Sequence, residues 1–393
     1  MEINERRVSQ HLRNFERALS GYDRKEPLAR YLTRFFKENK QMGSSDRKMT
    51  SRFCYNYFRL GNSYPKADIT RRLVLAEYLC EQHSDLVVLH DTELAQSIQL
   101  PLAQKVAILR DLIDFDIDTL FPLSDLISKD INRELFFESH FIQPDLFIRV
   151  KRGQVENVLH ILNREEVSIG SVSGQTIALP NGSKLQHIKG LNGLYEVQDR
   201  SSQYTINFMA CSENESWWDA CAASGGKSLL FLDKYPTVKL LVSDIRLSIL
   251  RNLDERFIQA GIQQSYRKKV IDLTDITNVR SILQEEQFDG IIVDAPCSGS
   301  GTWGRTPEMI QTFDKDRLQY FTGLQKQIVT QVIPFLKSGK PLVYITCSVY
   351  QAENEDIIDY IVNNFAMRLE KMEIIKGYEC KADSMFAARL SKV

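Results

Sequence analysis

The 393-residue sequence predicts an α/β protein with a parallel, doubly wound sheet in its C-terminal half and an all-helical N-terminal third. Helical periodicity runs through residues 1–130, and from about residue 205 short apolar runs alternate with glycine-containing loops and amphipathic stretches. The stretch between them mixes short strands with one helix. We therefore expect a helical domain at 1–130, a small α/β domain at 131–204 and the doubly wound domain at 205–393.

In the first domain, apolar residues recur at helical spacing within 32–36, 54–60 and 73–80, and the polar start signal Gly43-Ser-Ser-Asp precedes the second run. In the second domain, short strands at 147–150 and 176–179 flank a helix at 155–162.

The third domain shows five apolar runs that we expect to be strands, separated by helices such as 247–260, which Gly261 ends. Ligands of doubly wound sheets bind at the carboxyl ends of the strands, so side chains there are candidates for the functional site. The expected strands are Trp217–Ala220, Val238–Ser243, Lys269–Asp272, Gly290–Asp294 and Leu342–Thr346.

The charge distribution is polarised along the chain. The net charge is -1, which alone argues against a nucleic-acid partner. However, residues 1–72 carry roughly +9 and residues 73–145 roughly -10. The basic block is either an RNA-contacting surface or a set of solvated helix faces, and charge alone does not decide between them.

The cysteines indicate neither disulfides nor a metal site. There are seven, scattered along the chain without a Cys-x-x-Cys pair. The sequence also lacks a signal-peptide pattern and an apolar run of membrane-spanning length. We expect a cytoplasmic monomer without metal.

A loop of small residues, Asp219-Ala-Cys-Ala-Ala-Ser-Gly-Gly-Lys-Ser228, follows the first expected strand. A phosphate-binding P-loop would need glycine at the position of Cys221, so a nucleoside-binding loop is favoured over an ATP site. Asp244 and Asp272 follow the next two strands and could take ribose hydroxyls and an adenine amine, although each could equally be a cap or turn residue.

Two further strand ends present cysteines. Asp294-Ala-Pro-Cys297 ends the fourth strand, and Thr346-Cys347-Ser348 ends the fifth. Because the carboxyl ends of parallel strands converge, Cys297 and Cys347 should face one pocket beside Asp294. Such thiols suit covalent catalysis on a pyrimidine, because thiolate addition at C6 makes C5 nucleophilic towards a methyl donor.

Taken together, Asp219-Ala-Cys-Ala-Ala-x-Gly-Gly-Lys, Asp294-Ala-Pro-Cys-Ser-Gly-x-Gly-Thr and Thr346-Cys-Ser348 resemble the Sun (RsmB-type) family of RNA cytosine-C5 methyltransferases over about 147–393. Residues 1–130 more distantly resemble the NusB-like RNA-binding module, and 131–204 an RRM-like one. The resemblance implies a class I, Rossmann-like methyltransferase fold.

The resemblance also implies roles for individual residues. Cys347 would be the nucleophile on C6, Cys297 would assist breakdown of the covalent intermediate, and Asp294 would hold the cytosine edge with Lys227 near the base. S-adenosyl-L-methionine would be the cofactor. It would be held by Cys221, Ala222, Ala223, Ser224, Gly225, Gly226, Lys227, Asp244, Asp272 and Asp294.

The expected substrate is 16S ribosomal RNA, at a single-stranded or loop cytosine that can leave its stack. Transfer RNA is the alternative substrate, and a non-catalytic RNA-binding or ribosome-assembly factor on the same fold is the alternative function. Ser224 departs from the family pattern, which usually has proline there.

Overall fold

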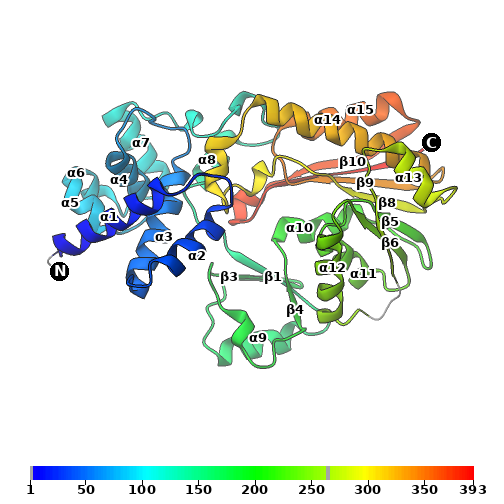
Figure 1. Ribbon diagram of the computed structural model, residues 1–393, viewed down its shortest axis with the longest axis horizontal. Helices are drawn as coiled ribbons and strands as arrows, with labels where there is room; N and C mark the ends of the chain where they lie inside the picture. The colour runs from blue at the N-terminus through cyan, green and yellow to red at the C-terminus, as the bar shows by residue number, and fades with distance from the viewer. Residues whose placement is uncertain (1–2, 263–265) are drawn as a thin grey trace. The chain divides into compact units, whose positions relative to one another are not determined.

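The computed structural model describes residues 3–262 and 266–393 (Figure 1). Contacts between Cα atoms divide the chain into two compact units. We call residues 1–125, 132–143 and 302–314 the helical unit, and residues 126–131, 144–301 and 315–393 the α/β unit. The division into three domains stays a prediction.

The helical unit packs around an aromatic core. Phe15 of α1 is fully buried, and its ring lies 6.2 Å from that of Phe53 and 5.5 Å from that of Tyr57, both on α3. Its helices are α1 (Glu5–Ser20), α2 (Leu28–Glu38), α3 (Ser44–Arg59), α4 (Ile69–Cys80), α5 (Asp85–His90), α6 (Thr92–Ser97), α7 (Leu102–Ile113) and α8 (Arg133–Ser139). The predicted helical character is confirmed.

Residues 302–314 also belong to the helical unit, although they follow the Cys297 motif in the sequence. Trp303 is 1% exposed, and its ring lies 4.9 Å from that of Phe121 and 5.1 Å from that of Phe313. The buried Glu308 accepts a hydrogen bond of 3.0 Å from the Leu28 amide at the start of α2. This segment is therefore part of the core of the helical unit.

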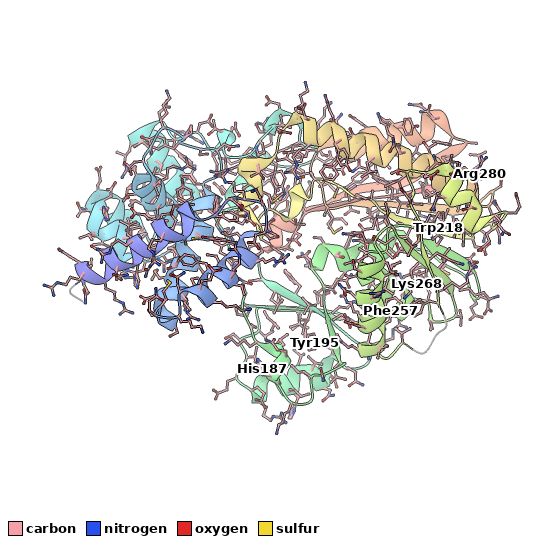
Figure 2. The ribbon with its side chains drawn as sticks, viewed as in Figure 1. His187, Tyr195, Trp218, Phe257, Lys268 and Arg280 are labelled. Carbon is pink, nitrogen blue, oxygen red and sulfur yellow. The ribbon has the colours of Figure 1, made fainter. Side chains whose placement is uncertain are left out.

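The α/β unit begins with a four-stranded antiparallel sheet in the order β2-β3-β1-β4. Its strands are β1 (Leu146–Val150), β2 (Ser171–Ser173), β3 (Thr176–Leu179) and β4 (Tyr195–Val197). Val158 and Leu162 of α9 (Val155–Arg164) pack on one face. On the other face, Arg149 forms an ion pair of 3.0 Å with Asp233. Figure 2 shows Tyr195 and His187 in this part of the unit.

The second sheet of the α/β unit has seven strands in the order β10-β11-β9-β8-β5-β6-β7. The five strands from β9 to β7 are parallel, and β11 is antiparallel to both of its neighbours. The strands are β5 (Ser216–Asp219), β6 (Lys239–Asp244), β7 (Tyr266–Val270), β8 (Gly290–Asp294), β9 (Pro341–Thr346), β10 (Met367–Ile375) and β11 (Met385–Lys392). The predicted doubly wound fold is confirmed.

One predicted strand is displaced. We expected the third strand at 269–272, but β7 ends at Val270, and Asp272 lies two residues beyond it. β7 is an edge strand and carries charged side chains on three consecutive residues, 267–269. A search for apolar runs therefore does not detect it. The apolar residues Ile271 and Leu273 are buried, but they lie in the loop that follows β7 and not in the strand.

Helices cover both faces of the large sheet, with α11 and α12 on one side and α13, α14 and α15 on the other (Figure 1). The helices of this part are α10 (Arg200–Tyr204), α11 (Gly226–Lys234), α12 (Leu247–Gln259), α13 (Ile276–Leu283), α14 (Lys315–Val332) and α15 (Glu355–Asn364). Within the described ranges, we find no helix with both the length and the apolar character needed to cross a membrane.

The bulky first strand of the large sheet is accommodated by its neighbours. Trp217 lies opposite Gly290 of β8, where an added Cβ would come within 2.3 Å of the indole ring. Trp218, labelled in Figure 2, points to the other face and donates a hydrogen bond of 2.9 Å to the Ser243 hydroxyl. Glycine at 290 is therefore the counterpart of tryptophan at 217.

Candidate active site

The small-residue loop connects β5 to α11 at the carboxyl end of the sheet. The Ala222 amide donates a hydrogen bond of 2.8 Å to the Ser243 carbonyl, which fixes the loop beside the end of β6. Gly225 has φ +80°, and an added Cβ there would lie 2.7 Å from Phe257 and 2.8 Å from Leu253 of α12. Only glycine lets the chain turn into α11 this close to α12, and Figure 2 shows Phe257 on that helix.

Carboxylates surround this loop. Asp219 is 1% exposed and accepts a hydrogen bond of 2.5 Å from the Ser228 hydroxyl. Burial raises the pKa of Asp219 to about 7. Burial also raises the pKa of the Cys221 thiol well above its ordinary value, and nearby carboxylates add to this effect, in the order Asp219, Asp294 and Asp244. Several carboxylates therefore lie close to the loop, together with the cations Lys227 and Arg246.

Asp244 ends β6, is 8% exposed, and accepts hydrogen bonds of 2.9 and 3.0 Å from the backbone and side chain of Arg246. The neighbouring Ile245 is 57% exposed. Asp272 accepts hydrogen bonds of 2.9 and 2.6 Å from the amide and hydroxyl of Thr274. Both acids therefore have local partners, and their role towards a cofactor stays a prediction.

Lys227 and Asp294 meet at the next strand end. The Lys227 ammonium donates a hydrogen bond of 2.7 Å to Oδ2 of Asp294. Burial lowers the pKa of Lys227, but the charge of Asp294 and this hydrogen bond outweigh burial and raise the pKa. The carboxylate of Asp294 thus keeps Lys227 cationic inside the site, with a smaller contribution from Cys347 nearby.

The two motif cysteines lie side by side, both half-buried. Their sulfur atoms are 3.4 Å apart, at the ends of the adjacent strands β8 and β9. The hydrogen bond with Cys347, followed by burial, raises the pKa of Cys297 well above its ordinary value. Either thiol could be the donor in this hydrogen bond, and the surroundings of Cys297 favour its protonated form.

Sequence reasoning missed a buried carboxylate behind the cysteines. Glu353 is fully buried and accepts hydrogen bonds from Ser298 and Ser348, the residues that directly follow the two cysteines. The repeated Cys-Ser pair was a usable signal for such a shared partner. Among the residues the structure describes, no cluster of three or more His, Cys, Asp or Glu side chains is arranged to hold a metal ion.

A family model for the 16S rRNA methyltransferase RsmB/F matches residues 206–390, which include every cysteine and carboxylate described above. Over these residues the chain is similar to the RsmB/F-type methyltransferases. A protein from Shewanella oneidensis named ribosomal RNA small subunit methyltransferase B is 35% identical over 168 residues, which cover 43% of this chain and 38% of that protein. The chain spans about half the length, or less, of the curated relatives it matches.

Solved structures share the fold of this chain. A crystal structure of a protein called PH0851 matches with a TM-score of 0.73 and 19% identity, covering 98% of both chains. A crystal structure of NSun6 from Pyrococcus horikoshii with SFG matches with a TM-score of 0.58 and 15% identity, covering 68% of this chain and 96% of that one. At these identities the likeness establishes the class I methyltransferase fold.

Proposed function

We propose that this chain transfers a methyl group from S-adenosyl-L-methionine to C5 of a cytosine in 16S ribosomal RNA, through a covalent bond between Cys347 and C6. The single observation that carries the proposal is the 3.4 Å separation of the Cys297 and Cys347 sulfurs. Two thiols in contact at adjacent strand ends, next to a Lys227–Asp294 ion pair, form a constellation for covalent chemistry on an electrophilic ring.

The residues of the loop fit the proposed cofactor. Its small side chains leave the backbone accessible, and the carboxylates around it complement the positive sulfonium of S-adenosyl-L-methionine. Asp244 would bind the ribose hydroxyls, and the exposed Ile245 would pack on the adenine ring. When bound, the cofactor supplies an electrophilic methyl group. The backbone of 221–226 would hold its remaining part, and Asp272 would reach the adenine amine.

The protein's own groups divide the work on the cytosine. The Cys347 thiolate adds to C6, and the electron pair of the C5–C6 double bond moves to C5, with negative charge spreading to N3 and O2. Asp294 would accept a hydrogen bond from the cytosine amino group, and the Lys227 ammonium would stabilise the developing charge. After methylation, a water molecule would take the C5 proton, the electron pair of the C5–H bond would re-form the C5–C6 double bond, and Cys347 would leave as thiolate. The thiol of Cys297 would donate a hydrogen bond to the leaving sulfur.

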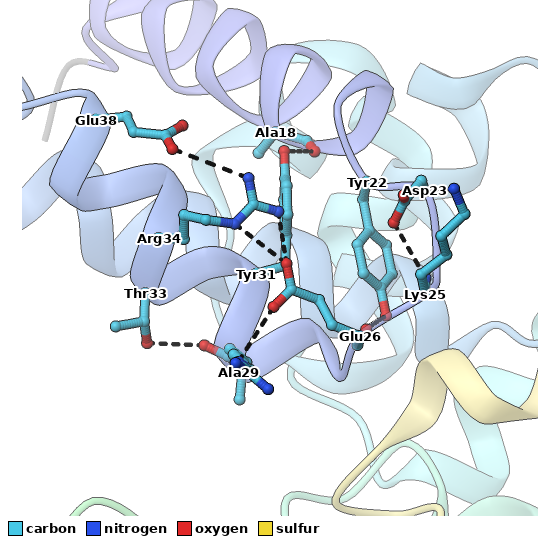
Figure 3. A network of polar contacts seen from close by, with 11 residues as sticks. Ala18, Tyr22, Asp23, Lys25, Glu26, Ala29, Tyr31, Thr33, Arg34 and Glu38 are labelled. Carbon is cyan, nitrogen blue, oxygen red and sulfur yellow. Dashed lines mark hydrogen bonds and ion pairs between the residues drawn. The ribbon is translucent and has the colours of Figure 1, made fainter.

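The helical unit would supply part of the RNA contact through its basic surface. Arg34 on α2 pairs with Glu26 at 2.5 Å and with Glu38 at 3.9 Å, as Figure 3 shows. Its positive charge is therefore partly neutralised. Lys37 and Lys40 are exposed, and no ion pair of either is found in the part of the chain that the structure describes. These two lysines are the better candidates for phosphate contacts.

The cysteine roles can be tested with purified protein, 16S rRNA and methyl-labelled S-adenosyl-L-methionine. Cys347→Ala should abolish label transfer, because the proposed covalent bond to C6 can then not form. Cys297→Ala should leave a protein–RNA adduct that survives a denaturing gel, because release of Cys347 is slowed. Cys211→Ala, which changes a half-buried thiol elsewhere in the α/β unit, is the matched control and should transfer label at the native rate.

Full activity of Cys347→Ala would contradict the nucleophile assignment, and inactivity of the native chain on every RNA would favour a binding factor. The substrate is identified by offering 16S rRNA, assembled small subunits and transfer RNA side by side. Bisulfite sequencing of total RNA from cells with and without the protein then locates the modified cytosine.

A further inference from the structure

Both cysteine loops of the α/β unit are tied to one buried carboxylate, Glu353. It lies in a short 3-10 turn, Gln351–Glu353, between strand β9 and helix α15, and is fully buried. Its oxygens accept hydrogen bonds from four groups. These are the Ser298 amide at 2.8 Å, the Ser298 hydroxyl at 2.5 Å, the Gln325 amide group at 3.2 Å and the Ser348 hydroxyl.

The hydrogen bonds act on both sides of Cys297. The Gln325 side chain, which is fully buried on α14, also donates a bond of 2.9 Å to the Pro296 carbonyl. Pro296 precedes Cys297 and Ser298 follows it. The backbone on each side of this cysteine is therefore held by the Glu353–Gln325 pair.

The Cys347 loop is held in the same way. The Ser348 hydroxyl donates to Oε2 of Glu353, the oxygen that also accepts from the Ser298 hydroxyl. Asn354, the next residue along, donates a bond of 3.0 Å to the Ser348 carbonyl and accepts one of 2.6 Å from the Thr346 hydroxyl.

We infer that Glu353 is a positioning residue of the methyl transfer, one that sets the distance between the two catalytic sulfurs by binding both cysteine loops through a single carboxylate. This rests on the proposed function of Cys297 and Cys347. Glu353 itself touches neither sulfur and acts through Ser298 and Ser348. A buried carboxylate with several hydrogen bonds holds its partners in fixed positions. Moving either loop would leave the carboxylate or a hydroxyl group without a hydrogen-bond partner, which is costly in a buried site.

Two substitutions distinguish the effect of the side-chain length of Glu353 from the effect of its charge. Glu353→Asp keeps the charge but withdraws the carboxylate by one methylene group, so it can hold only one loop. Glu353→Gln removes the charge but keeps the length, and its amide can still bridge both loops. We expect kcat of Glu353→Asp to fall about 100-fold, as for other misplacements of reacting groups by about 1 Å. Glu353→Gln should stay within about tenfold of native, and the KM for S-adenosyl-L-methionine should not change in either variant.

A second measurement reports the sulfur distance without any activity. Diamide removes the two thiol hydrogens of a neighbouring pair and is itself reduced to the hydrazine as the disulfide forms. Peptide mass mapping then gives the rate at which Cys297 and Cys347 cross-link. The rate should drop in Glu353→Asp and be restored in Glu353→Gln. Glu77→Gln is the matched control, since Glu77 is an equally buried, hydrogen-bonded carboxylate of the helical unit. It should lower Tm without changing the cross-linking rate.

Native kcat and cross-linking in Glu353→Asp would overturn the inference, as would loss of activity confined to Glu353→Gln, which would assign the effect to charge. If Glu353→Asp does not fold, Ser348→Ala takes its place, because it removes the hydrogen bond between Glu353 and the Cys347 loop and leaves those from Ser298 to Glu353 in place. A kcat within twofold of native in Ser348→Ala would then count against Glu353. If the native protein shows no methyl transfer, the proposed function fails instead, and the cross-linking result still stands by itself.

Discussion

Replacing the buried Asp219 by asparagine should change how stability depends on pH. Burial holds the pKa of Asp219 at about 7, against an ordinary value of 3.8. Between these two values the unfolded chain releases the proton while the folded chain keeps it, so folding becomes less favourable as pH rises. The contribution of Asp219 to the free energy of unfolding is therefore most favourable below pH 3.8 and becomes less favourable until the pH reaches about 7.

The size of the effect follows from the shift. At 1.36 kcal/mol for each pKa unit, a rise from 3.8 to about 7 costs the native protein about 4 kcal/mol at neutral pH. Asp219→Asn has no proton to lose, and the Ser228 hydroxyl can donate to the oxygen of the new amide. Relative to the native protein, the free energy of unfolding of the variant should rise by about 4 kcal/mol between pH 4 and pH 8.

Urea unfolding followed by tryptophan fluorescence measures this, because Trp217 and Trp218 directly precede Asp219 and both are fully buried. Asp275→Asn is the control. Asp275 is an exposed cap of α13, and hydrogen bonds from Thr277 lower its pKa, so its pH trend has the opposite sign. A stability difference between Asp219→Asn and native protein that does not vary from pH 4 to pH 8 would refute the reasoning.

Three further predictions concern the backbone and the basic surface. Gly290→Ala should cost about 3 kcal/mol or more, because its Cβ would overlap the Trp217 ring; Gly323→Ala, a helical position with open space around it, should instead stabilise by about 0.5–1 kcal/mol in the same urea assay. Gly225→Ala should weaken binding of S-adenosyl-L-methionine in calorimetry, since φ +80° and the contact with α12 exclude a side chain, and native affinity would contradict this. Weaker RNA binding at unchanged cofactor affinity is expected on neutralising the exposed basic residues of and after α2, which are Arg30, Arg34, Lys37 and Lys40. Unchanged RNA binding would contradict this and favour the alternative interpretation, in which these residues only form solvated helix faces.

The sequence was sufficient to predict that Cys297 and Cys347 would meet, because two parallel neighbouring strands end at the same edge of the sheet. It could not predict Glu353, since a glutamate before a helix is indistinguishable from a solvated one until the turn folds back under both loops. The edge strand β7 was misplaced for a related reason, because solvent on one side lets charged residues occupy a strand.

Contacts between residues far apart in the sequence could not be predicted either. Trp217 is a bulky residue in a central strand, and only its register with Gly290, 73 residues away, explains how it fits. The segment 302–314 lies only a few residues beyond Cys297 in the sequence, yet its aromatic residues complete the core of the helical unit. Long-range complementarity of this kind leaves no local pattern in a sequence.

The path of the chain through residues 302–314 has a practical and an evolutionary consequence. The chain leaves the α/β unit after Gly301, contributes to the helical unit, and returns at Lys315. No single cut can therefore separate the two units, and a fragment lacking residues 1–143 would expose Trp303, Ile310 and Phe313 to water. The helical unit is therefore not a detachable accessory of the α/β unit. Recombination that exchanged it as a cassette would have to replace thirteen residues in the middle of the other unit at the same time.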